Sequence, residues 1–147
     1  MRHPIRTLLL SFGLASALSV SLLAGTPASA ATTLELAFVT KINAERKLRG
    51  LRALPARAYL TNKAHDHSAA MARRGRLYHS NLANICCYRS VGENVGVGYT
   101  VSGIHRALMN SSGHRANILG RSWTGVGVGV VKSGGRLWVT QIFRQSS

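Results

Sequence analysis

Three side chains within residues 78–119 could do chemistry together: the imidazoles of His79 and His114 and the carboxylate of Glu93. Such a set can bind a divalent metal or transfer protons. Glycines lie close to Glu93 on both sides and directly before His114, and glycine lets the backbone bend where other residues are strained. We therefore predict that the three side chains point into one solvent-accessible cleft, within reach of a shared metal ion or water.

The first 30 residues are typical of a secretory signal peptide. They begin with the basic residues Arg2 and Arg6, continue with an apolar run from Leu8 to Leu23, and end in the small-residue site Ala28-Ser29-Ala30. A membrane anchor is the alternative, but four serines interrupt the apolar run. Because no later stretch could span a bilayer, we expect a secreted protein without a transmembrane segment after cleavage.

Residues 31–147 are enough for one domain with a single core and too few for two. They carry 17 Lys and Arg against four Asp and Glu, a net charge of +13 with neutral histidines. A basic exported domain is expected to associate with anions, which outside a cell favours an anionic cell-wall polymer or lipid. No nucleic-acid-binding motif is present, so nucleic acid is not an expected partner. The alternative is an ordinary solvated basic surface.

Cys86 and Cys87 are the only cysteines. A disulfide between such neighbours would close a small strained ring, so an intermolecular bridge and two buried thiols compete with it. Export makes oxidation more favourable than it is in the cytosol. For that reason a nucleophile and base formed by either thiol with His79 is disfavoured.

Two amphipathic helices are predicted first in the exported chain. Thr32 and Glu35 have the spacing of a capping box, which predicts a helix from there to about residue 49. A second helix is predicted over residues 56–74, with His67 on its apolar side as a hydrogen-bonded core residue rather than a ligand. Apolar residues recur along the expected buried sides: they are Leu34, Phe38, Ile42 and Leu48 in the first helix and Leu60, Ala64 and Met71 in the second.

The segment of residues 81–99 has no helical period and contains both cysteines and three glycines. These features predict a long functional loop with short extended pieces. A third helix is predicted over residues 101–110, and a turn and a short further helix are predicted to end at Leu119.

Residues 124–132 and 136–144 are predicted as two strands joined by a turn at Ser133-Gly134-Gly135. In the first strand valines alternate with glycines, so that one face is bare backbone against which a helix or a loop could lie closely. The second strand is apolar on both faces and needs cover on both sides. The predicted fold class is therefore α+β, a three-layer α-β-α sandwich around a small antiparallel sheet.

Several segments occur in an order that carries a family resemblance. They are Ile42-Asn43-Ala44-Glu45-Arg46, His67-Ser68, His79, Gly92-Glu93-Asn94-Val95, the run from Met109 to Leu119, Gly125-Val126-Gly127-Val128 and Val139-Thr140-Gln141-Ile142-Phe143. This ordered set resembles the bacterial form of the CAP superfamily, which comprises SCP-like, pathogenesis-related and cysteine-rich secretory protein domains. The resemblance extends over residues 31–147 as a single domain.

The resemblance implies an α-β-α sandwich with a cleft lined by two histidines and two acids. His79, Glu93 and His114 match three of these four positions. The second acid should fall a few residues before His114, where this chain has Asn110-Ser111-Ser112, so Ser111 is expected to line the cleft without supplying a carboxylate. The resemblance also implies that His79 and His114, with Glu93, bind zinc or another divalent metal.

The missing acid bears on function. A catalytic zinc site needs a general base near its bound water, and Ser111 cannot serve as one at neutral pH. No standard hydrolase motif is present. We therefore predict a binding module rather than an enzyme. One alternative is a metal-dependent hydrolase of peptides or wall polymers, and another is a structural role in which the three residues hold loop and helices together without metal.

Overall fold

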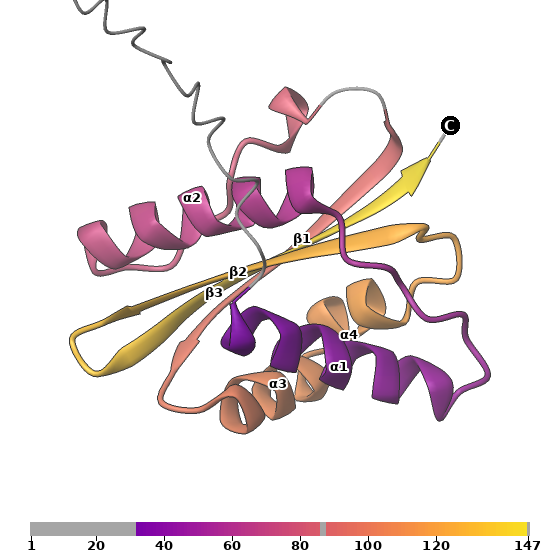
Figure 1. Cartoon of the computed structure of the whole chain (residues 1–147), viewed down its shortest axis with the longest axis horizontal. Helices are drawn as coiled ribbons and strands as arrows, with labels where there is room; N and C mark the ends of the chain where they lie inside the picture. Colours follow the sequence, from indigo (N-terminus) through magenta and orange to yellow (C-terminus); the bar gives the residue numbers. More distant parts are fainter. Residues whose placement is uncertain (1–31, 86–87, 147) are drawn as a thin grey trace, which may run out of the picture.

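A computed structural model describes residues 32–85 and 88–146 of the chain (Figure 1). The predicted signal peptide and the predicted alternatives for Cys86 and Cys87 lie outside the described residues. Within the described part, no helix is long and apolar enough to cross a membrane.

Three antiparallel strands form the middle layer of the fold. They are β1 (Tyr88–Gly98), β2 (Gly125–Ser133) and β3 (Arg136–Ser146). The order across the sheet is β1-β3-β2, so β3 is the central strand and pairs with both neighbours. Gly134 and Gly135 turn the chain between β2 and β3 with φ angles of 56° and 71°, which confirms the predicted hairpin.

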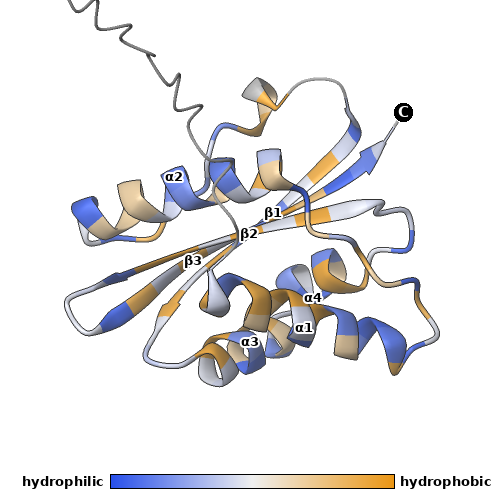
Figure 2. Cartoon of the chain, in the orientation of Figure 1, coloured by the Kyte–Doolittle hydropathy of each residue, from blue (hydrophilic) through white to orange (hydrophobic). Residues whose placement is uncertain are grey.

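Helices cover both faces of this sheet, as the predicted sandwich requires (Figure 1). One face carries α2 (Ala58–Arg74), and the other carries α1 (Thr33–Lys47), α3 (Val101–Asn110) and α4 (Ser112–Leu119). A 3-10 turn, Leu82–Asn84, lies between α2 and β1. Apolar residues run along the strands between the two helical layers (Figure 2).

The larger part of the apolar core lies between the sheet and the three-helix layer. Phe38 and Ile42 of α1 are fully buried there against the valines of β2 and against Phe143 of β3. On the α2 face, Leu60 and Ala64 pack with Ile142, while Met71 packs with Val95 and Trp138. Each face of the central strand β3 is thus buried, as its apolar sequence on both sides predicts.

The bare glycine face of β2 lies against α2, as predicted. A Cβ atom added to Gly127 would collide with the backbone of Leu60, and one added to Gly129 would collide with the backbone of His65. The helix therefore approaches the strand more closely than any side chain would permit.

The prediction of a loop over residues 81–99 is wrong, because most of this segment is the long strand β1. It pairs with β3 from Tyr88 to Gly98, with one register shift near Ser90. Its glycines indicated a loop, yet Gly96 and Gly98 lie where Ile104 of α3 contacts the strand. They have the same role as the glycines of β2, which is close contact with a helix.

The buried side of α1 also differs from the prediction. Leu34 is 37% exposed and Leu48 is 80% exposed, whereas Glu35 and Arg46 are buried. The capping box of Thr32 and Glu35 is present, and the second carboxylate oxygen of Glu35 accepts a hydrogen bond from the backbone N–H of Val130 at 3.2 Å. The buried carboxylate thus joins the start of α1 to the sheet.

Arg46 is fully buried and links three segments of backbone. Its Nη1 donates to the carbonyls of Ile118 and Gly120, each at 2.8 Å, and its Nε donates to the carbonyl of Arg52 at 2.8 Å. Carbonyls at the end of a helix lack partners within the helix. Arg46 therefore satisfies the end of α4 from α1, across the core.

Candidate functional site around His79 and His114

His79 follows α2 in a segment that is held close to the helix. Gly75 ends α2 in the left-handed conformation, at φ 64°. Nε2 of His67 then donates to the carbonyl of Tyr78 at 2.8 Å, and the two rings meet edge to face with centroids 4.8 Å apart. His67 is half-buried and hydrogen-bonded. It positions the residue directly before His79.

Glu93 lies in β1 with its side chain only 1% exposed. Because side chains alternate along a strand, Glu93 shares a face with Val91 and Val95, which pack on the α2 side. Its Oε1 accepts from Nδ1 of His79 at 2.7 Å and from the N–H of Ser80 at 2.9 Å. Its Oε2 accepts from the Ser80 hydroxyl. Both carboxylate oxygens are therefore engaged by the two residues that follow Tyr78.

The ring of His79 is oriented by this contact and remains open to solvent, with 62% of the side chain exposed. A neutral imidazole carries one N–H and one lone pair. When Nδ1–H donates to the carboxylate, the lone pair is on Nε2, which is the form that can bind a metal ion.

His114 lies in α4, and an amide network ties this helix to β1. Asn94 donates through Nδ2 to the carbonyl of His114 and to Oε1 of Gln141, both at 3.1 Å. Asn117 donates through Nδ2 to the carbonyl of Glu93 at 3.0 Å and to Oδ1 of Asn94 at 2.9 Å. The backbone of Glu93 and that of His114 are thus fixed relative to each other.

Burial lowers the pKa of His114 below its ordinary value of 6.5, and the positive charge of His79 lowers it further. The structure joins His79 directly to Glu93 at 2.7 Å, and the amide network holds the helix that carries His114 against the strand that carries Glu93. At neutral pH the lowered pKa keeps His114 uncharged, which is the form that can act as a ligand.

The remaining expected site residue, Ser111, lies half-buried between α3 and α4. Its side chain makes no capping hydrogen bond to α4. Across residues 32–85 and 88–146, no group of three His, Cys, Asp or Glu side chains is arranged to hold one metal ion. The hydrogen bond from Nδ1 of His79 places the Glu93 carboxylate at the side of the ring opposite Nε2, where it orients the ring.

Sequence reasoning missed the residues that support these groups. Ser80 supplies two of the three hydrogen bonds to Glu93, and Asn94, Asn117 and Gln141 form the amide network. One signal was available: Gln141 directly precedes Ile142 and Phe143 in the middle of β3, where it is fully buried, and a buried polar residue requires a partner.

Comparison with known proteins establishes the family. Residues 39–143 match the model of CAP, the cysteine-rich secretory protein family. This chain belongs to that family. The "Uncharacterized protein YkwD" of Bacillus subtilis (strain 168) is 32% identical over 124 residues, which cover 77% of this chain and 48% of that protein.

Solved structures agree with this assignment and with the three-layer fold. An extracellular protein containing a SCP domain from Bacillus anthracis str. Ames superposes with a TM-score of 0.69 at 23% identity, over 77% of this chain and 40% of that one. The crystal structure of NaASP2 with Zn2+ superposes with a TM-score of 0.63 at 11% identity, over 81% and 83% of the two chains. The CAP chain described here spans less than half the length of its two Bacillus relatives.

Proposed function

We propose that this CAP protein is a secreted binding module in which His79 and His114 bind a divalent metal such as Zn2+ and Glu93 orients His79. The observation that carries the proposal is the pairing of a buried carboxylate with an exposed imidazole at 2.7 Å. Histidines that bind metal commonly donate their other ring N–H to a carboxylate, which fixes the tautomer and makes the ligating nitrogen more basic.

The electrostatics of His114 fit the same donor set. The proton on His79 disfavours a proton on His114, so the two rings are suited to share one cation rather than to carry a proton each. A bound ion would offer open coordination positions to oxygen atoms of a ligand. NaASP2 was crystallised with Zn2+, which supports a metal-binding role for members of this fold.

The bonds of Glu93 favour binding over hydrolysis. A general base must reach the water that it activates, but this carboxylate is buried and accepts hydrogen bonds from His79 and Ser80. The chain also has Asn110-Ser111-Ser112 where the resemblance would place the second acid. Metal-dependent hydrolysis of peptides or wall polymers is therefore the less favoured function.

The charge of the domain supports an anionic ligand outside the cell, either a wall polymer or a lipid. Three of the four carboxylates are engaged within the described fold: Glu35 with Val130, Glu45 with Arg49, and Glu93 with His79. Most of the 17 basic side chains therefore have no carboxylate partner within the described residues, and their charge can attract an external anion. The relative from Bacillus anthracis is described as extracellular, which supports the same location for this chain.

Calorimetric titration of zinc tests the metal proposal. The proteins would be wild type, His79→Ala, His114→Ala and, as a control, His65→Ala, which removes an exposed histidine on α2. We expect each site variant to lose most of the affinity and the control to retain it. Peptide and peptidoglycan cleavage would be assayed in parallel, with and without zinc.

Two results would overturn parts of this proposal. Zinc binding that survives both site variants would place the metal elsewhere and leave the histidines a structural role. Zinc-dependent cleavage that either variant abolishes would replace the binding module with a hydrolase.

A further inference from the structure

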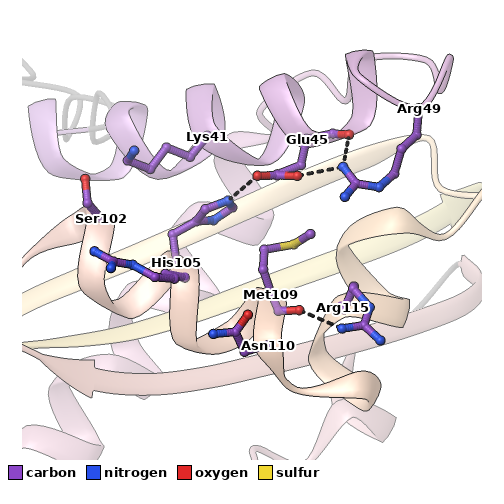
Figure 3. Close-up of a pocket in the computed structure, with 9 residues that line it drawn as sticks. Lys41, Glu45, Arg49, Ser102, His105, Met109, Asn110 and Arg115 are labelled. Carbon is purple, nitrogen blue, oxygen red and sulfur yellow. Dashed lines mark hydrogen bonds and ion pairs between the residues drawn. The ribbon is translucent and has the colours of Figure 1, made fainter.

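A second polar site lies in the three-helix layer, away from His79 and Glu93. It is a pocket of about 530 Å³ between α1 and α3, open to solvent, with Arg115 of α4 also in its lining (Figure 3). Its charged and titratable lining consists of Lys41, Glu45, Arg49, His105, Arg106 and Arg115.

Helical periodicity builds the walls of this pocket. Lys41, Glu45 and Arg49 are spaced four residues apart and therefore share one face of α1. His105 faces them from α3, and its ring points toward Glu45 (Figure 3). Arg106 of the same helix also lines the pocket. The adjacent sides of the two helices are anchored in the core by Ile42 of α1 and Ile104 of α3.

Positive charge in this pocket exceeds negative charge. Four cationic side chains line it against the single carboxylate of Glu45, which lies 2.6 Å from Nη1 of Arg49. Within the described residues, Lys41 and Arg106 have no carboxylate within 4.0 Å. Arg115 donates one N–H to the carbonyl of Met109 at 3.0 Å and keeps its other donors. A concave site with like charges on its walls focuses the field and attracts counter-ions.

His105 adds a group whose charge can respond to an occupant. It is 6% exposed, its Nε2 lies 3.9 Å from Oε1 of Glu45, and its Nδ1 is buried without a hydrogen-bond partner among the described residues. Burial lowers the pKa of His105; Glu45 raises it in part and Lys41 lowers it again. An anion in the pocket would oppose the effects of burial and of Lys41, because it favours the charged imidazolium.

We propose that this pocket binds the phosphate group of an anionic extracellular ligand. Arginine guanidinium groups match phosphate oxygens in geometry, and lysine adds a point charge. The volume is larger than a phosphate ion needs and leaves room for an attached polyol or headgroup, to which Ser102 and Asn110 of the lining could hydrogen-bond. The inference rests on the anionic ligand of the proposed function and assigns it a defined site on the protein.

Titration with inorganic phosphate, with glycerol phosphate and with vesicles of phosphatidylglycerol or phosphatidylcholine tests the proposal. Lys41→Gln and Arg106→Gln remove pocket charges, and Lys47→Gln and Arg73→Gln remove exposed charges of the same kind outside the pocket. Each pocket variant should weaken glycerol phosphate binding by about tenfold, the scale of one lost hydrogen bond to a charged group, and each control by less than about twofold. Binding should also shift the ring resonances of His105 and raise its pKa.

Glu45→Gln distinguishes a loss of phosphate binding from a loss of the fold. It removes the one negative charge of the pocket and keeps an oxygen that can accept from Arg49, so phosphate should bind more tightly, a gain that a damaged fold cannot produce. If the pocket variants weaken the binding of both glycerol phosphate and phosphatidylglycerol vesicles, the phosphate group can come from a lipid. If the vesicles do not bind, it comes from a polymer or a free phosphate.

If pocket and control variants weaken glycerol phosphate binding equally, the pocket is not the phosphate site, and the proposed binding through net charge stands. Absence of any binding at low salt would overturn the pocket and the anionic part of the proposed function together. The zinc titrations are independent of both results.

Discussion

Oε1 of Glu93 lies 2.7 Å from Nδ1 of His79, so a carboxylate that solvent hardly reaches holds an imidazole that solvent largely surrounds. The acid belongs to β1, which is hydrogen-bonded to β3 along nearly its whole length. The sheet therefore fixes the direction of the His79 ring. A site placed on a strand is held more precisely than one placed on a loop.

The contact of Glu93 with His79 predicts the effect of Glu93→Gln on zinc binding. The amide keeps the shape but loses the negative charge that orients the ring, so zinc affinity should fall by about 10-fold to 100-fold. Asp66→Asn makes the same charge change on an exposed part of α2 and should leave affinity unchanged. Calorimetry on both variants measures the effect, and equal affinities would show that Glu93 does not support a metal ligand.

Stability should fall on mild acidification. The pKa values of His105 and His114 lie below 6.5 in the folded protein, so below about pH 6.5 the unfolded chain binds more protons than the folded chain. The free energy of unfolding should therefore decrease as pH falls from about 7.5 to about 5.5. Urea denaturation across this range should show a smaller decrease for His105→Gln than for wild type.

His65→Gln is the control for this pH dependence, since it replaces an exposed histidine of α2. It should retain the wild-type slope. If His105→Gln retains that slope as well, the burial of His105 between α1 and α3 does not contribute to acid sensitivity.

Arg46→Met should be strongly destabilising. The substitution keeps an apolar stem but removes three hydrogen bonds to buried or half-buried carbonyls, and the loss should be at least about 3 kcal/mol. Lys47→Met, at the exposed next position, should change stability by less than about 0.5 kcal/mol. Denaturant midpoints for the two variants give the comparison, and similar midpoints would mean that water replaces the guanidinium without cost.

Two glycine substitutions should act in opposite directions. Gly129→Ala places a methyl group into the backbone of α2 at His65, and because a helix backbone cannot move aside locally, we expect a loss of at least about 2 kcal/mol. Gly113→Ala meets nothing within 4 Å and lies in α4, so it should stabilise the protein by about 0.5 kcal/mol. Thermal melts distinguish these outcomes. A neutral Gly129→Ala would show that α2 does not lie as close to β2 as described.

Binding to an anionic polymer should depend steeply on salt. The excess of positive charge is largely exposed and salt screens exposed charges within about 10 Å at 0.1 M, so retention should fall by more than about tenfold between about 0.05 and 0.2 M salt. Pull-down on an anionic wall polymer, with uncharged dextran as control, measures this. Retention that does not change with salt would point to a ligand recognised without its charge.

The sequence predicted the parts of the fold that depend on local patterns. Thr32 and Glu35 form the expected capping box, Gly134 and Gly135 form the expected turn, and the glycines of β2 lie against a helix. Each of these signals is contained within a few neighbouring residues, and no distant partner is needed to interpret it.

The missed features depend on partners that belong to other elements of the fold. Arg46 is buried because carbonyls more than 70 residues later accept its hydrogen bonds, while the apolar Leu48 stays exposed. The glycines of β1 suggested a loop because the reason for them is not visible in the strand's own sequence. That reason is the contact with Ile104, which belongs to α3. Ser80 gave no signal, because its role is to hold a carboxylate 13 residues further along.

The central position of β3 determines the order in which this fold can form. β1 and β2 do not pair with each other, and both pair with β3. The ribosome synthesises β3 after the other two strands. The sheet therefore cannot assemble on a growing chain until residues 136–146 have emerged, and its assembly requires contacts between distant segments, which form slowly. Until then the apolar faces of α1 and α2 have no completed sheet to cover, so the native core can form only after the last strand has been made.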